Sequence, residues 1–124
     1  MVVFDSSILI DALRKKKDAL ELIEYYSEKE RIAITVISKY EVLRGVKENN
    51  ISLATGLIAR FIVYDLEDSS VTEAVRIYRK VRAKGKSVSE LDVLIAGIAA
   101  TKDETLITRD KDFLNFESEK IEVV

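Results

Sequence analysis

Four acidic residues of this chain stand in comparable places, each just after an expected strand or near the start of an expected helix: Asp5, Glu41, Asp92 and Asp110. The chain contains no histidine and no cysteine. Their absence removes the commonest general base, and it removes the imidazole and thiolate ligands that zinc prefers. Catalysis by this chain would therefore use carboxylates, hydroxyls, lysine, arginine or a metal ion held by oxygen ligands.

Each of the four acids also has a purely structural interpretation. Asp5 and Asp110 are good N-cap residues for the helices expected after them. Residues 38–41 fit a capping box, and residues 89–92 nearly do, with Asp in place of the usual Glu. Taken one at a time, helix capping explains each acid at least as well as chemistry does.

The positions of the acids depend on the elements that carry them. Alternating apolar and β-branched runs predict strands at 2–4, 31–37, 61–66 and 105–108, with 120–124 as a candidate fifth. Helical spacing predicts helices at 6–13, 18–28, Ser38 to about Gly45, 51–60, 69–83 and 90–100. Strands that alternate with helices indicate an α/β fold, here a three-layer α/β/α sandwich with a central parallel sheet of four to five strands. A length of 124 residues without a linker or repeat predicts one domain, 1–124.

Two of these helices are expected to pack through apolar faces. The helix at 90–100 is apolar nearly all round, which indicates burial. The helix at 69–83 is amphipathic, and the spacing predicts that its buried face consists of Val71, Val75, Tyr78 and Val81.

The four acids become more informative when they are considered together. In an open α/β sheet, ligands bind outside the carboxyl ends of the strands, and helix N-termini gather at the same edge. Four carboxylates there would repel one another strongly, and the adjacent Arg109 need not face them. A hard divalent cation would relieve the repulsion, and Mg²⁺ or Mn²⁺ suits an oxygen-only ligand set. The pattern therefore predicts a Mg²⁺ (or Mn²⁺) site that includes Asp5.

The segments around these acids resemble four sequence motifs of the PIN-domain family, in particular its VapC-type toxin ribonucleases. The matching segments, in chain order, are VVFDSSILID, YEVLRG, ELDVLIAGIA and LITRDKDF. The resemblance implies catalytic and metal-binding roles for Asp5, Glu41, Asp92 and Asp110, with Asp112 as a further candidate ligand, and supporting roles for Ser6 and Thr108.

The resemblance also implies an activity and partners. It implies a metal-dependent endoribonuclease that hydrolyses RNA phosphodiester bonds and leaves a 5′-phosphate and a 3′-hydroxyl. It further implies the toxin half of a type II toxin–antitoxin pair, a VapB-like antitoxin as partner, and a homodimer. A cytoplasmic protein is expected, because no leader and no membrane-length apolar run is present.

A basic segment at 79–87 holds five Lys and Arg residues just before the Asp92 helix. Lys84 and Lys86 flank Gly85, where the helix should end, so they are expected to contact RNA phosphates. The alternative is a solvated helix face without a ligand.

Two other functions fit the same fold. A receiver-type signalling domain needs an acidic pair after strand one and a phosphoacceptor aspartate after strand three. Here Asp5 is followed by two serines, and Asp65 is a poor acceptor candidate. A non-catalytic PIN-like module that binds RNA or protein is the other alternative, and the complete acid set argues against it.

Overall fold

A five-stranded, fully parallel sheet forms the centre of the computed structural model, which describes residues 1–117 and 119–124. The strands are β1 (Val2–Phe4), β2 (Ile32–Thr35), β3 (Ile62–Tyr64), β4 (Thr105–Thr108) and β5 (Ile121–Val123). They lie in the order β3-β2-β1-β4-β5, and each neighbouring pair is parallel. The predicted parallel sheet and its fifth strand are confirmed.

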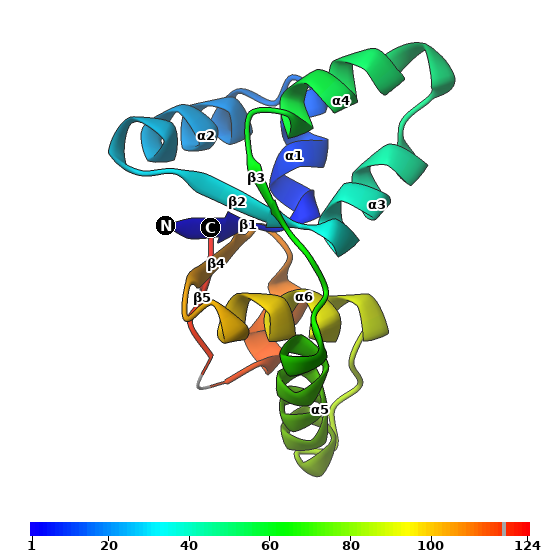
Figure 1. Ribbon diagram of the computed structural model, residues 1–124, viewed down its shortest axis with the longest axis vertical. Helices are drawn as coiled ribbons and strands as arrows, with labels where there is room; N and C mark the ends of the chain where they lie inside the picture. The colour runs from blue at the N-terminus through cyan, green and yellow to red at the C-terminus, as the bar shows by residue number, and fades with distance from the viewer. Residues whose placement is uncertain (118) are drawn as a thin grey trace.

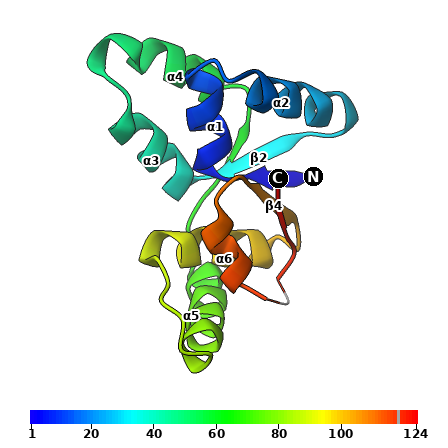
Figure 2. The ribbon, with the colours of Figure 1, turned by 180° about the vertical axis from the view of Figure 1, so that it is seen from behind.

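The helices cover the sheet on both faces. They are α1 (Ser6–Leu13), α2 (Lys17–Lys29), α3 (Val36–Gly45), α4 (Ile51–Ile58), α5 (Asp68–Ala83) and α6 (Glu90–Thr101), with 3₁₀ turns η1 (Glu48–Asn50) and η2 (Lys111–Asn115). Helices α1 to α4 lie on one side and α5 and α6 on the other (Figures 1 and 2), which confirms the three-layer α/β/α sandwich. Among the residues that the structure describes, none of the helices combines the length and apolar composition needed to cross a membrane.

The core consists of two clusters, one on each face of the sheet. Successive side chains of a strand point to opposite faces. Accordingly, Val2 and Phe4 pack with the α1–α4 layer, whereas Val3 packs with the α5–α6 layer. Because both faces are covered, β1 is buried throughout, and its apolar run ends only at Asp5.

Helix α3 begins earlier than the sequence suggested. Its N-cap is Thr35, whose hydroxyl oxygen accepts a hydrogen bond of 3.0 Å from the backbone N–H of Ser38. The prediction of a cap at Ser38 is therefore wrong, and Ser38 is instead buried in the first turn. The capping box over 38–41 does not form, which leaves the carboxylate of Glu41 free for other contacts.

The buried face of α5 also differs from the prediction. The helix buries Ser70, Ala74, Ile77 and Val81, while Val71, Val75 and Tyr78 are exposed. Only Val81 of the predicted face lies in the core. The reason is close packing against α6: a Cβ built on Gly97 would lie 2.7 Å from the carbonyl oxygen of Ser70 and 2.9 Å from the Cβ of Ala74. Contact this close requires small residues, which a hydrophobicity pattern does not reveal.

Candidate active site

The four predicted acids meet at the carboxyl edge of the sheet. Strands β1 and β4 are neighbours near the centre of the sheet. Strands β2 and β3 lie on one side of β1, and β4 and β5 lie on the other, so the strand order reverses between β1 and β4. Such a switch point is the usual ligand-binding crevice of an open α/β sheet. Asp5 follows β1 and Asp110 follows β4, while Glu41 comes from α3 and Asp92 from the N-terminal turn of α6.

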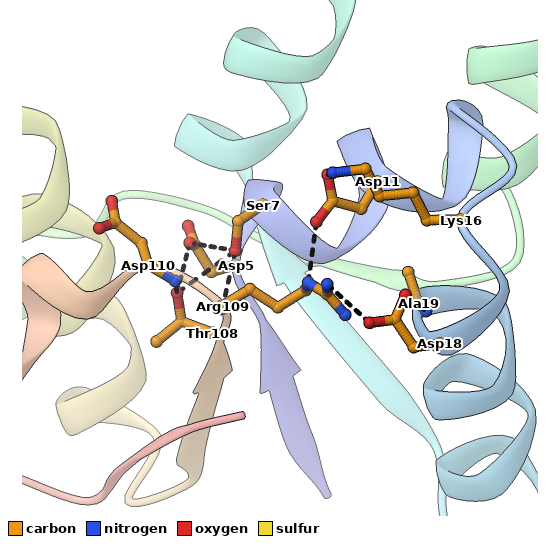
Figure 3. A network of polar contacts seen from close by, with 9 residues as sticks. All are labelled: Asp5, Ser7, Asp11, Lys16, Asp18, Ala19, Thr108, Arg109 and Asp110. Atoms are coloured by element: carbon orange, nitrogen blue, oxygen red, sulfur yellow. Dashed lines mark hydrogen bonds and ion pairs between the residues drawn. The ribbon is translucent and has the colours of Figure 1, made fainter.

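Asp5 is held by hydroxyl groups and does not cap a helix with its side chain. It occupies the N-cap position of α1, but its carboxylate makes no capping bond. Instead Oδ2 accepts hydrogen bonds from the hydroxyls of Thr108 at 2.7 Å and Ser7 at 3.0 Å (Figure 3). Its side chain is buried, and burial raises the pKa of Asp5, while the bonds from Thr108 and Ser7 oppose that rise. Asp5 therefore occupies the N-cap position of α1, as the capping interpretation predicted, but hydroxyl groups hold its carboxylate in place of a capping hydrogen bond.

Two backbone amides orient these hydroxyls. The N–H of Arg109 donates to Oγ of Ser7, and the N–H of Asp110 donates to Oγ1 of Thr108, both at 3.0 Å. Since each hydroxyl oxygen accepts from an amide, its single proton is free to point at Oδ2 of Asp5. In the part of the chain that the structure describes, the hydroxyl of Ser6 donates a longer hydrogen bond of 3.4 Å to Oδ1. Oδ1 is therefore the less tightly held oxygen of Asp5 and the better placed one for a ligand.

Glu41 is connected to the same group of residues through Ser6. Its Oε1 accepts a 3.0 Å hydrogen bond from the hydroxyl of Ser6. Burial raises the pKa of Glu41, the bond from Ser6 lowers it, and the charges of Asp5 and Asp110 raise it further. The structure thus places Ser6 and Thr108 beside the acids, in positions that suit the supporting roles expected for them.

Asp92 is strongly perturbed by burial and by the acidic residues around it. Burial, followed by the charges of Asp5, Asp110 and Glu41, raises the pKa of Asp92 to about 7. The N-terminus of a helix normally favours a carboxylate, so the desolvation and the like charges outweigh that effect here. At neutral pH the four acids therefore cannot all ionise without a considerable cost in free energy.

Asp110 and Asp112 differ in their surroundings. Oδ1 of Asp110 caps η2 by accepting the backbone N–H of Asp112 at 2.9 Å, so its capping interpretation is correct for that oxygen. Asp110 is half-buried, whereas Asp112 is exposed, and the charge of Asp112 acts on Asp92 less than those of the other three acids. Asp110 thus interacts with Asp92 more strongly than Asp112 does, and it is the better candidate for the fourth acid of the cluster.

The donor set fits a hydrated divalent cation. Within residues 1–117 and 119–124, no three acidic side chains lie close enough together to enclose a metal ion. Mg²⁺ does not need such a cage, because it keeps several waters and commonly binds one or two carboxylates. Burial and the repulsion between like charges raise the pKa of Asp92, and a bound cation would offset both effects. Asp5 and Asp92 could hold the ion, with Glu41 and Asp110 close by.

Lys84 and Lys86 lie at the end of α5, next to an acidic residue. Nζ of Lys84 forms an ion pair of 2.5 Å with Glu117, and both lysine charges lower the pKa of Glu117. A hollow of about 270 Å³ lies between this end of α5 and the cluster; it is lined by Ser87, Val88, Ser89, Asp92, Asp112, Asn115 and Phe116. Neither lysine lines this hollow. Their predicted contacts with RNA phosphates stay a prediction.

Sequence reasoning missed one hydroxyl of the site and the partners of Arg109. Ser7 was not distinguished from Ser6, although it is Ser7 that bonds to Asp5 and to the backbone of Arg109. The side chain of Arg109 points away from the acids and pairs with Asp11 and Asp18 (Figure 3). The only sequence signal for Ser7 was its position two residues after Asp5, and no local pattern indicated the partners of Arg109.

Fold and site together define a class: a small doubly wound α/β protein with a carboxylate cluster at the switch point of its sheet. The family model described as PIN domain matches residues 2–118, and the chain belongs to the PIN domain family. The resemblance expected from the sequence is thereby confirmed.

Individual relatives agree with this assignment. Over 97 residues the chain is 34% identical to Ribonuclease VapC3 of Methanocaldococcus jannaschii, a match that covers 77% of this chain and 95% of that protein. It is 26% identical over 109 residues to Ribonuclease VapC19 of Mycobacterium tuberculosis, covering 87% of each. Its fold matches a chain of DNA-bound VapBC from Salmonella typhimurium with a TM-score of 0.85, at 22% identity, over 99% of this chain and 98% of that one.

Proposed function

We propose that this chain is a divalent-metal-dependent endoribonuclease that hydrolyses RNA phosphodiester bonds, and that it is the toxin of a VapBC-like toxin–antitoxin pair. Relatives named VapC ribonucleases and a fold shared with VapBC complexes support the proposal. The single observation that carries it is the cluster of four carboxylates, in which burial and then like charges raise the pKa of Asp92 to about 7. Such a cluster is unfavourable in a protein where the acids have only a structural role, but it provides the cation site of a metal-assisted hydrolase.

The roles of the residues follow from their contacts. Asp5, through Oδ1, and Asp92 would hold Mg²⁺ or Mn²⁺, with Glu41 and Asp110 completing the acidic set. The bound cation would stabilise charge on the phosphoryl oxygens and acidify a water for attack on phosphorus. Thr108 fixes the orientation of Asp5, since its hydroxyl donates to Oδ2 at 2.7 Å.

Ser6 orients Glu41 in the same way, by donating to Oε1 at 3.0 Å. Asp112, at the exposed rim, is the further candidate ligand. We assign phosphate contacts farther along the RNA to Lys84 and Lys86, which would have to release Glu117 in part.

The proposal includes the partners that the family resemblance implies. These are single-stranded RNA as substrate, a VapB-like antitoxin that occludes the acidic site, and a second copy of the chain in a homodimer. A cytoplasmic location and a single folding domain, 1–124, complete it. Sedimentation of the isolated chain and of the chain co-expressed with its neighbouring antitoxin gene would measure both associations.

Cleavage of a labelled single-stranded RNA tests the activity. The wild-type protein should cleave in Mg²⁺ or Mn²⁺ and stop in excess EDTA. Asp5→Asn should remove activity and keep the fold, because it deletes a ligand charge at nearly constant volume. A matched control is Asp103→Asn, an exposed acid just before β4 and hence at the opposite edge of the sheet.

The outcomes separate catalysis from binding alone. Full cleavage in excess chelator, or equal activity of the Asp5 and Asp103 variants, would contradict the metal mechanism. RNA binding without any cleavage by the wild-type protein would favour the non-catalytic module instead.

A further inference from the structure

Arg109 joins two helices to the loop that carries Asp110. Its Nε pairs with Oδ2 of Asp11, near the end of α1, and its Nη2 pairs with Oδ2 of Asp18, in the first turn of α2, both at 2.8 Å. Figure 3 shows the guanidinium between these two acids, turned away from the carboxylate cluster. A planar guanidinium can serve two acids with fixed geometry, which a lysine ammonium does not.

The two partners of Arg109 lie on opposite sides of a tight turn. Between α1 and α2 the backbone of Lys15 adopts φ 61°, a left-handed conformation that is unfavourable for a residue with a side chain. Lys16 adds a 3.3 Å ion pair to Asp11 from within that turn. The contacts of Arg109 therefore connect β4, α1 and α2 at one point, and the cation is balanced locally by the two acids.

The backbone of Arg109 connects this point to the active site. Its N–H donates to Ser7, and the next N–H, of Asp110, donates to Thr108. Both hydroxyls then donate to the same oxygen of Asp5. A change in the course of residues 109–110 would therefore disturb the orientation of Asp5 and the position of Asp110 together.

We propose that Arg109 is a positioning residue of the nuclease site: pinned between Asp11 and Asp18, it holds the 109–110 backbone so that the carboxylates of Asp5 and Asp110 keep the orientation needed at a metal ion. The metal part of this inference rests on the proposed function. The positioning part rests on the hydrogen bonds alone. Groups that orient metal ligands in this way typically change metal affinity or activity 10- to 100-fold when removed.

Two variants interrupt the contact from its two ends. Arg109→Gln removes the cation. Asp18→Asn removes one partner whose side chain is 65% exposed, so it is expected to fold even if the first variant does not. Arg109→Lys keeps the charge without the fork and should give an intermediate effect. Because both ends act through one contact, the double variant of Arg109 and Asp18 should be no worse than Arg109→Gln alone.

Arg76 offers a matched control. It too is held by two acids, Glu73 at 2.9 Å and Glu119 at 2.8 Å, and it lies on α5 beside residues that precede β4, at the opposite edge of the sheet. Arg76→Gln thus removes a comparable pair of contacts without touching the carboxylate cluster. Any loss of stability common to the two arginine variants is a general effect of losing ion pairs.

Three measurements test whether Arg109 positions the site. In Arg109→Gln, hydrogen exchange of the Arg109 and Asp110 amides in the metal-free protein should accelerate roughly five- to tenfold, as expected for loss of supporting hydrogen bonds. Its Mn²⁺ affinity, measured without RNA, should fall about tenfold. Its kcat for RNA cleavage should fall by a similar factor with little change in KM, while Arg76→Gln leaves all three unchanged.

The failures of the two proposals are distinguishable. If wild-type protein neither cleaves RNA nor binds Mn²⁺, the proposed function is wrong, and the exchange rates alone judge the positioning role. If Arg109→Gln exchanges its 109 and 110 amides at the same rates as Arg76→Gln and keeps its Mn²⁺ affinity, the positioning role is wrong, whatever the nuclease activity.

Discussion

Replacement of Asp92 by Asn should stabilise the metal-free protein, and the gain should grow with pH. Folded protein holds a proton on Asp92 up to about pH 7, whereas the unfolded chain loses it near its ordinary pKa of 3.8. Between these values the folded state binds more protons, so the free energy of unfolding falls as pH rises. The contribution is fully present below pH 3.8 and lost above about pH 7. Asn at this position does not titrate, so the variant escapes the loss.

The size of the effect can be derived from the same pKa. The difference between 3.8 and about 7 corresponds to roughly 4 kcal/mol if solvent had no influence. Asp92 is only half-buried, so screening by solvent reduces the expected penalty to about 1–2 kcal/mol. The opposing effect is the favourable interaction of a carboxylate with the N-terminus of α6, which is worth about 0.3–1 kcal/mol. The sign of the result therefore tells which effect dominates.

Urea unfolding in EDTA at pH 5, 6, 7 and 8 measures this directly. At pH 5 the two proteins should differ little, and at pH 8 Asp92→Asn should be more stable by about 1–2 kcal/mol. Asp103→Asn, which alters an exposed acid away from the cluster, should show no such trend. Saturating Mg²⁺ should stabilise wild type more than the Asp92 variant. An Asp92→Asn protein that is less stable than wild type at pH 8 in EDTA would refute the crowding argument and favour a capping role.

Two further predictions concern binding and packing. Replacing Lys84 and Lys86 by Ala should weaken RNA binding and reduce the slope of log affinity against log salt by about 1.4, or about 0.7 per lost phosphate contact. An unchanged slope would show that these lysines belong to a solvated helix face and do not contact RNA. Gly97→Ala should destabilise the fold by about 1–3 kcal/mol because its Cβ would overlap α5. Gly56→Ala, in α4 with open space around it, should stabilise by about 0.5–1 kcal/mol; equal effects of the two glycine changes would contradict the packing of α5 on α6.

Much of the fold could be predicted from local patterns. Every strand and every α-helix has a matching segment in the sequence, because alternation, apolar runs and chain punctuation are properties of neighbouring residues. The N-terminal limit of α3 was harder to predict. Thr35 and Ser38 are equally good caps by composition, and only the structure shows that the helix starts at Val36.

The convergence of the four acids was also predictable, because topology alone brings strand ends and helix N-termini to one edge. The contacts between them were not. The bond from Thr108 to Asp5 joins residues 103 positions apart, and Arg109 reaches Asp11 across nearly the whole chain. Such pairings depend on the register of β1 beside β4, which a single sequence does not specify.

The buried face of α5 shows a different limit. Hydrophobicity favoured Val71, Val75 and Tyr78, yet the helix turns the small residues Ser70 and Ala74 toward α6. Close helix packing selects residues for their size, so the most apolar stripe is not always the buried one.

The most direct test of the central claim, that these carboxylates hold the divalent cation of a nuclease, is anomalous diffraction from a crystal soaked in Mn²⁺. We expect a Mn²⁺ peak between Oδ1 of Asp5 and the carboxylate of Asp92, at ligand distances of about 2.0–2.3 Å, and no peak there in Asp5→Asn. A wild-type crystal with no Mn²⁺ at this position, or with Mn²⁺ bound only at other acids, would contradict the claim.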